Sequence, residues 1–257
     1  MLTNLVIPRA DFEAATQTEP ATQYLADVYR TGIMFERSGE QILLNDSSIG
    51  LTEGQILWYL ARSSHSKSVI ETGFGRGGSA AFFLSALAPW NGTLVSIDHA
   101  FRHWAGDTGI HYINQLGLAE NHRLIEEPSE LALAKIVSKS SAEYLSLSYI
   151  DGSHHFDGTL IDFMHLDRLT EIGGIIAIDD AHAPAVRTVA SFVANNLPYN
   201  LHYPTQRLLL CKKFAHDERD WSHFRPFTSS PKADWDVHDD QANVVAVPGA
   251  TFGHLPK

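Results

Sequence analysis

The sequence predicts an α/β protein built on a doubly wound, mostly parallel sheet. Between residues 68 and 214, short runs rich in β-branched side chains alternate with longer segments of helical period, which is the pattern of βαβ units. The runs are largely apolar, as strands covered by helices on both faces are. A glycine-rich stretch follows the first run, at the place where sheets of this class bind nucleotide-like ligands.

The individual elements follow from this alternation. We expect strands at residues 68–72, 93–98, 122–127, 144–151 and 174–179. We expect helices at residues 79–88, 108–116, 129–138, 156–169 and 185–195, with Ser79 and Ser129 as N-caps. Beyond the last helix, the runs at 200–204 and 206–213 are predicted to form an antiparallel pair at the sheet edge.

The length of 257 residues suits one compact domain with appendages. Residues 1–67 carry helical stretches and are expected to form an extension that caps the ligand site or contacts another subunit. Residues 68–214 form the predicted core. From residue 215 to 257, aromatic, histidine and acidic residues mix without a period, which indicates an irregular tail and a candidate lid.

Charge and composition limit the classes of partner and substrate that the protein is expected to bind. The net charge of −11, without a stretch dense in Lys and Arg, argues against nucleic acid and favours a small neutral or cationic substrate. The sequence has neither an apolar stretch of bilayer length nor the apolar segment of a signal peptide, so we expect a cytoplasmic protein without membrane attachment. The single cysteine, Cys211, excludes an intramolecular disulfide. A homo-oligomer is the default expectation.

The glycine-rich stretch from Glu71 to Ser79 is predicted to hold a cofactor, because glycines let the backbone come close to a ligand. The spacing of Gly73, Gly75 and Gly78 also suits a nicotinamide dinucleotide, so the glycines alone leave the cofactor open. Glu71 would repel a pyrophosphate but attract the ammonium group of S-adenosylmethionine (SAM), which favours SAM. Asp98, at the end of the second strand, is expected to bind the ribose hydroxyls of either cofactor.

Three aspartates follow the fourth and fifth strands, whose ends face one crevice in a parallel sheet. Asp151, Asp179 and Asp180 would repel one another unless they were protonated or bridged by a cation, and an all-oxygen cluster suits Mg²⁺ or another hard divalent ion. Such an ion would lower the pKa of a substrate hydroxyl. His154 is the predicted base, with His155 and His182 as alternatives.

Two motifs resemble known enzyme families. An acid followed by G-x-G-x-G, present as Glu71, Gly73, Gly75 and Gly77, resembles the class I SAM-dependent methyltransferases over residues 68–213. That resemblance implies a Rossmann-like sheet of about seven strands, and it implies that Ser129 lies near the adenine. The segment Asp-Gly-Ser-His-His followed by Asp-Asp is similar to the metal-dependent macrolide-sugar O-methyltransferases and, more broadly, the catechol-type O-methyltransferases.

The second resemblance implies residue roles. Asp151, Asp179 and Asp180 would bind magnesium, and His154 would be the base, with Asp151 serving the cofactor and the catalytic step as well. We therefore predict a SAM-dependent, magnesium-dependent O-methyltransferase acting on a hydroxyl of a small polyhydroxylated molecule, a sugar or a phenol of natural-product biosynthesis. The alternatives are a metal-free N- or C-methyltransferase, a nicotinamide-dependent oxidoreductase, and a non-catalytic ligand-binding member of the fold.

Overall fold

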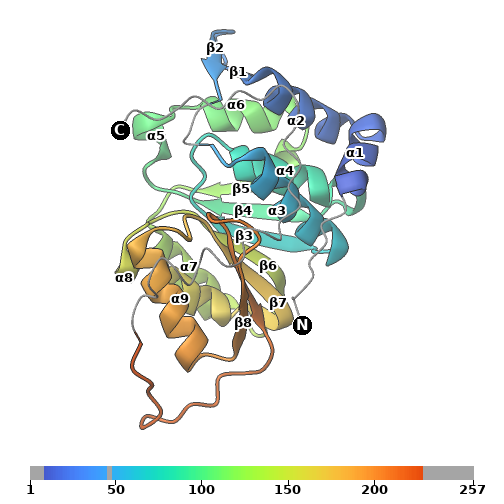
Figure 1. Ribbon diagram of the computed structural model, residues 1–257. Helices are drawn as coiled ribbons and strands as arrows, with labels where there is room; N and C mark the ends of the chain where they lie inside the picture. The colour runs from blue at the N-terminus through green and yellow to red at the C-terminus, as the bar shows by residue number, and fades with distance from the viewer. Residues whose placement is uncertain (1–8, 45–47, 228–257) are drawn as a thin grey trace.

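The computed structural model describes residues 9–44 and 48–227 and shows a seven-stranded sheet between two layers of helices (Figure 1). The strand order is β5-β4-β3-β6-β7-β9-β8, with β9 antiparallel to its neighbours and the strands from β5 to β7 parallel. This arrangement confirms the predicted doubly wound fold and the predicted antiparallel pair. The strands are β3 (Ser68–Thr72), β4 (Thr93–Ile97), β5 (His122–Ile125), β6 (Leu145–Ile150), β7 (Thr170–Ile178), β8 (Tyr199–His202) and β9 (Leu209–Lys213).

Each face of the sheet has its own apolar core. One core gathers Trp58, Phe82 and Phe83, and the other gathers Phe163 and Val189. The first lies under α1 (Arg9–Thr18), α2 (Pro20–Thr31), α3 (Leu51–Ser63), α4 (Gly78–Leu87) and α6 (Thr108–Gln115). The second lies under α7 (Ser129–Lys139), α8 (Phe156–Asp167) and α9 (Pro184–Asn196), and the short α5 (Phe101–Trp104) follows β4.

The N-terminal extension shares the first core. Phe12 packs edge-on against Trp58, with ring centroids 5.3 Å apart, and also contacts Phe82. The extension is helical, as predicted, but it also contains a hairpin of β1 (Ile33–Phe35) and β2 (Gln41–Leu43) that the sequence did not reveal, because strands of three residues show no clear alternation. The extension is therefore continuous with the core on this face.

Several predicted boundaries were wrong. β7 begins at Thr170 rather than at residue 174, and β5 ends at Ile125 rather than at residue 127. Neither predicted N-cap is present. Helix α4 begins after Gly77, whose φ of +76° lies in the left-handed region, and α7 begins at Ser129 itself after Pro128. The Ser79 hydroxyl donates a hydrogen bond to a buried carboxylate instead of capping the helix.

The described part of the tail, residues 215–227, lies along α9. Asn196 and Arg225 exchange two hydrogen bonds, from Asn196 Nδ2 to the Arg225 carbonyl (3.0 Å) and from the Arg225 amide to Asn196 Oδ1 (2.8 Å). Phe227 packs edge-on against Phe192 at 5.3 Å. Residues 215–227 form neither helix nor strand. The rest of the predicted lid, residues 228–257, lies outside the described residues.

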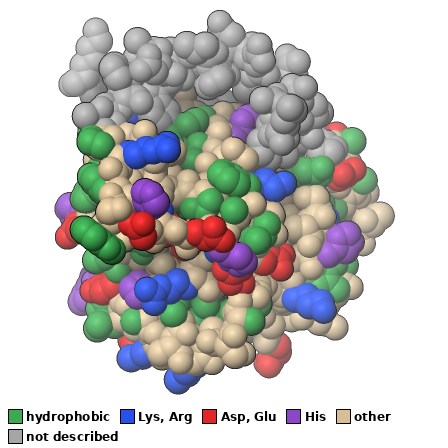
Figure 2. Space-filling model, turned by 90° about the horizontal axis from the view of Figure 1, so that it is seen from below, with side chains coloured by type: hydrophobic (Ala, Val, Ile, Leu, Met, Phe, Trp, Pro, Cys, Tyr) green, Lys and Arg blue, Asp and Glu red, His purple; other side chains and the backbone are tan. Residues whose placement is uncertain are grey.

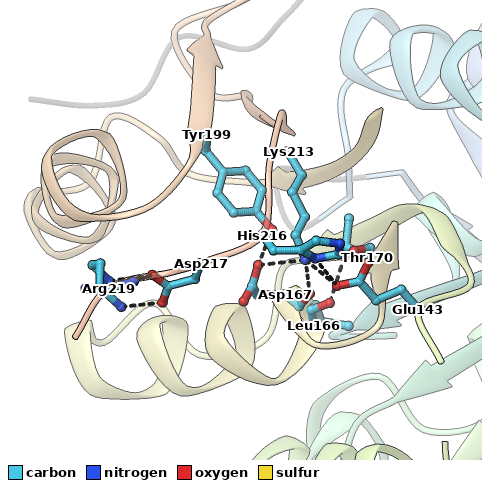
Figure 3. A network of polar contacts seen from close by, with 9 residues as sticks. All are labelled: Glu143, Leu166, Asp167, Thr170, Tyr199, Lys213, His216, Asp217 and Arg219. Carbon is cyan, nitrogen blue, oxygen red and sulfur yellow. Dashed lines mark hydrogen bonds and ion pairs between the residues drawn. The ribbon is translucent and has the colours of Figure 1, made fainter. Parts of the chain in front are cut away.

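A buried lysine ties β9 to α8 and β7 (Figure 3). Lys213 is 2% exposed, and its Nζ donates hydrogen bonds to Glu143 Oε1 (2.8 Å), the Asp167 carbonyl (2.8 Å) and the Thr170 carbonyl (2.9 Å). The Tyr199 hydroxyl donates to Asp167 Oδ1 at 2.7 Å. With three acceptors, the buried ammonium group of Lys213 has all its hydrogen-bonding capacity filled. Removing this group would leave the carboxylates of Glu143 and Asp167 without a positive charge beside them.

Lys213→Met is therefore expected to lower the free energy of unfolding by about 3 kcal/mol or more, because Glu143 and Asp167 lose their cation. Urea denaturation measures this change. Lys212→Met, next to it on β9 and less buried, is the matched control and should change stability by less than about 0.5 kcal/mol. Equal effects of the two substitutions would contradict the assigned role of Lys213.

Figure 2 shows the molecule from below the view of Figure 1. On this face, Lys and Arg side chains are scattered singly among acidic, histidine and apolar ones, and they do not gather into a basic stripe. In residues 9–44 and 48–227, none of the helices combines the length and apolar character that crossing a bilayer requires.

Candidate active site

The carboxyl edge of the sheet places four predicted site residues side by side. The residue that directly follows each of four parallel strands is still hydrogen-bonded, through its backbone amide, to the neighbouring strand. These hydrogen bonds join the Asp98 amide to Ile125, the Gly73 amide to Ile97, the Asp151 amide to Thr72 and the Asp179 amide to Ile150, at 2.8 to 3.0 Å. Since neighbouring strands lie about 4.8 Å apart, Asp98 and Asp151 flank Gly73 at one strand spacing each, and Asp179 lies one strand beyond Asp151.

The glycine loop between β3 and α4 needs glycine at two positions in particular. Gly73 has φ +87°, and a Cβ there would overlap the carbonyl oxygen of Asp151 on the neighbouring strand. Gly75 has φ +51°, and its Cβ would lie 2.9 Å from Cη2 of Trp104. The loop therefore lies close to the backbone that follows β6 on one side and to the Trp104 ring on the other, which leaves no room for side chains at these two positions.

Asp98 organises the loop through backbone amides. Its Oδ2 accepts hydrogen bonds from the Phe74 and Gly75 amides, both at 3.0 Å, and its Oδ1 accepts from the Ala100 and Phe101 amides at 2.8 and 3.0 Å. The sequence predicted a ribose-binding acid at this position but not this set of donors. The carboxylate thus joins the glycine loop to the start of α5, where it is only partly buried.

Glu71 lies beneath the loop and is fully buried. Its two oxygens accept hydrogen bonds from Ser79 (2.7 Å) and from Ser96 (2.6 Å), which pairs with Glu71 in register between β3 and β4. Ser96 also lies 2.8 Å from His122 Nε2. The structure therefore does not open Glu71 to the crevice, as binding an ammonium group directly would require. Glu71 supports the loop from below through Ser79.

Burial raises the pKa of Glu71 to about 7 and lowers the pKa of His122 to about 4, since both charged forms lose solvation. The hydrogen bonds from Ser96 and Ser79 oppose the shift of Glu71 without cancelling it. Glu71 therefore releases its proton much closer to neutral pH than an exposed glutamate does.

Glu71→Gln is expected to change stability differently at pH 5 and pH 8. The folded protein keeps the proton of Glu71 up to about pH 7, and the unfolded chain releases it near 4.5, so this group costs stability as the pH rises between these values. The cost reaches about 3 kcal/mol above pH 7. Urea denaturation should show the variant gaining about that much relative to the unchanged protein between pH 5 and pH 8. A stability difference independent of pH would refute this.

Asp151 and Asp179 form the acidic part of the crevice. Burial, followed by the charges of Asp179 and Asp180, raises the pKa of Asp151 well above its ordinary value. Burial, followed by the charge of Asp180, raises the pKa of Asp179. Asp179 is 5% exposed, and its Oδ1 is buried without a hydrogen-bond partner among the described residues. Glu53 of α3, which the sequence did not single out, adds a further negative charge.

Asp180 contacts Arg207 and lies near two histidines. It has φ +49°, a left-handed conformation that aspartate tolerates better than most residues. Its Oδ1 accepts a hydrogen bond from Arg207 Nη2 at 2.8 Å, and its Oδ2 lies 3.5 Å from His154 Nδ1. His182 Nδ1 lies 3.8 Å from Asp180 Oδ1, whereas His155 is turned to Ser153. His154 and His182 therefore both border the acidic crevice.

The structure does not show the predicted magnesium site. In the part of the chain that the structure describes, no group of three or more His, Cys, Asp and Glu side chains is placed to hold a metal ion. The cation that contacts Asp180 here is the guanidinium of Arg207. Ser129, predicted to lie near the adenine, is the first residue of α7 and neighbours the buried Asp162.

Comparison with known protein families identifies the central segment. Residues 70–181, which run from β3 through the glycine loop and Asp151 to the turn after Asp180, match a family model described as a methyltransferase domain. Over these residues, the chain is similar to a methyltransferase domain. This confirms the predicted enzyme class, and none of the curated proteins compared with the sequence matches it.

Solved structures share the fold of this methyltransferase domain. An SAH-bound methyltransferase of Podospora anserina is 15% identical, with 84% of this chain and 99% of that chain covered and a TM-score of 0.57. An O-methyltransferase of Bacillus cereus in complex with SAH is 13% identical, with 79% and 97% covered and a TM-score of 0.58. The O-methyltransferase TomG of Streptomyces achromogenes, bound to SAM and involved in tomaymycin synthesis, is 16% identical, with 80% and 96% covered and a TM-score of 0.55. At these identities the similarity establishes the fold.

Proposed function

We propose that this protein transfers the methyl group of SAM to a hydroxyl of a small polyhydroxylated molecule. The observation that carries the proposal is the alignment of Asp98, Gly73, Asp151 and Asp179 along the carboxyl edge of the sheet. This alignment sets a cofactor cradle beside a group of hydrogen-bond acceptors, as methyl transfer to a hydroxyl requires.

The cofactor half of the proposal rests on the glycine loop. Gly73 and Gly75 give the loop left-handed turns that most other residues rarely adopt, and Asp98 directly follows β4, where a carboxylate can accept hydrogen bonds from ribose hydroxyls. The structures of similar fold from Podospora anserina and Streptomyces achromogenes hold SAH and SAM. SAM is therefore the proposed cofactor, ahead of a nicotinamide dinucleotide.

The acceptor half rests on the acidic crevice. Asp151, Asp179 and Asp180 offer several acceptors on one edge, which suits a molecule with neighbouring hydroxyls. His154, next to Asp180, takes the hydroxyl proton on a ring nitrogen. The hydroxyl oxygen then forms the bond to the methyl carbon, the bond from carbon to sulfur breaks, and its electron pair returns to sulfur to leave SAH. This favours transfer to oxygen over transfer to nitrogen or carbon.

A magnesium-assisted version of this reaction is the second candidate. One observation favours it, the buried Asp179 Oδ1 without a hydrogen-bond partner among the described residues. A hard divalent cation held by Asp151, Asp179 and Asp180 would lower the pKa of the acceptor hydroxyl. Such binding requires Arg207 to leave Asp180. Natural-product biosynthesis, the cytoplasmic location, the homo-oligomer and the absence of nucleic-acid and membrane partners stay predictions.

The decisive experiment is calorimetric titration of the protein with SAM and SAH, with Mg²⁺ and with chelator. Binding of both ligands supports the cofactor assignment, and Gly75→Val, which would press on Trp104, is the variant expected to block it. Transfer of a labelled methyl group to sugars and catechols then tests the acceptor class. Failure to bind SAM and SAH, or binding of a nicotinamide dinucleotide in their place, would overturn the proposal.

A further inference from the structure

Arg207 reaches the acidic crevice because of how β9 pairs with β7. The two strands are antiparallel, and Ile178 lies opposite Leu209. Continuing this register by two residues, forward from Ile178 and backward from Leu209, places Asp180 opposite Arg207. The Ala181 amide donates a 2.8 Å hydrogen bond to the Arg207 carbonyl. The backbone therefore fixes where Arg207 lies relative to the two aspartates that follow β7.

The turn that carries Arg207 is itself held in place. Thr205 Oγ1 accepts hydrogen bonds from the Arg207 amide (3.2 Å) and the Leu208 amide (3.1 Å). Leu208 is fully buried and belongs to the core under α3 and α4. The fold therefore positions the backbone of Arg207, although its side chain reaches the surface.

The guanidinium of Arg207 lies against both aspartates. Its Nη2 donates a 2.8 Å hydrogen bond to Asp180 Oδ1 and lies 3.7 Å from Asp179 Oδ2. The side chain of Arg207 is 47% exposed, while those of Asp179 and Asp180 are 6% and 22% exposed. The cation thus covers the outer side of the pair and still borders solvent.

Arg207 contacts the same carboxylate oxygens, on Asp179 and Asp180, that a divalent metal ion would use as ligands. A metal ion on Asp179 and Asp180 would lie next to a permanently charged guanidinium, and the two cations would repel each other at short range. The guanidinium also has several N–H donors in a fixed plane. These donors can bind the acceptor's hydroxyl oxygen and stabilise the negative charge that develops on it during methyl transfer.

We propose that Arg207 is the resident cation of this site, so that its guanidinium, and not a divalent metal, balances Asp179 and Asp180 and binds the acceptor oxygen. This inference rests on the proposed methyl transfer to a hydroxyl. It assigns to Arg207, which the sequence motifs do not include, a role in positioning the acceptor, and it makes the reaction independent of added metal.

Manganese binding, followed by electron paramagnetic resonance, tests the inference without relying on turnover. The unchanged protein should bind Mn²⁺ no more tightly than about 1 mM, and Arg207→Gln should bind it at least about tenfold more tightly, because the competing charge is gone. Arg207→Lys keeps the charge and should resemble the unchanged protein. Arg219→Gln is the matched control, since Arg219 also pairs with a carboxylate, Asp217, on the tail.

Turnover adds a second readout. Chelator should leave the unchanged protein active and should abolish whatever activity Arg207→Gln regains with Mg²⁺. Tight stoichiometric binding of Mn²⁺ by the unchanged protein, or loss of its activity in chelator, would overturn the inference. Arg207→Lys decides the matter if Arg207→Gln does not fold, since tight Mn²⁺ binding by the lysine variant would also overturn it. Failure of the proposed function is distinguishable, because it appears as absent SAH binding.

Discussion

Gly73→Ala is expected to abolish SAH binding and to lower the free energy of unfolding by more than about 3 kcal/mol. The new methyl group would overlap the Asp151 carbonyl, which belongs to the neighbouring strand and cannot move without shifting the end of β6. The substitution also places alanine at φ +87°, a conformation that only glycine adopts readily. Urea denaturation and calorimetry with SAH measure the two effects.

Gly173→Ala separates the steric overlap from the backbone strain. Gly173 has φ +93°, close to that of Gly73, but a Cβ there would meet no atom within 4 Å. Its substitution should cost only the strain, about 1 kcal/mol, and should leave SAH binding unchanged. If the two substitutions cost the same, or if Gly73→Ala binds SAH normally, then the close approach of the loop to β6 does not shape the cofactor site.

Asp179→Asn is expected to lower turnover at least about 100-fold while SAH affinity stays within about threefold, since Asp179 belongs to the acceptor side of the crevice. The same substitution should raise stability at neutral pH. Burial and the charge of Asp180 raise the pKa of Asp179, so its ionised form is unfavourable in the folded protein, and asparagine removes that charge. Turnover and the urea midpoint are therefore expected to move in opposite directions.

Asp157→Asn serves as the control for this prediction. Asp157 lies in the first turn of α8, where its side chain is exposed and its charge is solvated. Its substitution should leave turnover unchanged and should alter stability by less than about 0.5 kcal/mol. Normal turnover in Asp179→Asn would remove Asp179 from the mechanism. Lower stability in that variant would instead show that the ionised carboxylate is favourable in the fold.

The sheet was predictable from the sequence because its strands are apolar runs that glycine and polar turns interrupt. The positions of Asp98, Asp151 and Asp179 followed from the same runs, since each aspartate comes directly after a buried strand. A parallel sheet brings such ends to one edge whatever the order of its strands. The part of the site that depends only on strand ends was therefore predictable.

The partners of these residues were not predictable. Arg207 contacts Asp180 because of the register between β7 and β9. Register depends on how two separate segments pair, so a motif within one segment does not reveal it. Ser96 meets Glu71 for the same reason across β3 and β4. The sequence does not distinguish an aspartate that accepts hydrogen bonds from backbone amides from one that binds a ligand. The hydrogen bonds between Asp98 and the glycine loop were therefore not predicted.

The last strand of the described chain lies inside the sheet, between β7 and β8. During synthesis on the ribosome, β8 leaves first and has no neighbour until β9 follows, because β8 pairs only with β9. The segment that completes the sheet also delivers Arg207 to Asp180 and Lys213 to Asp167. A nascent chain that stops before residue 207 therefore lacks both the cation beside Asp180 and the cation beside Asp167.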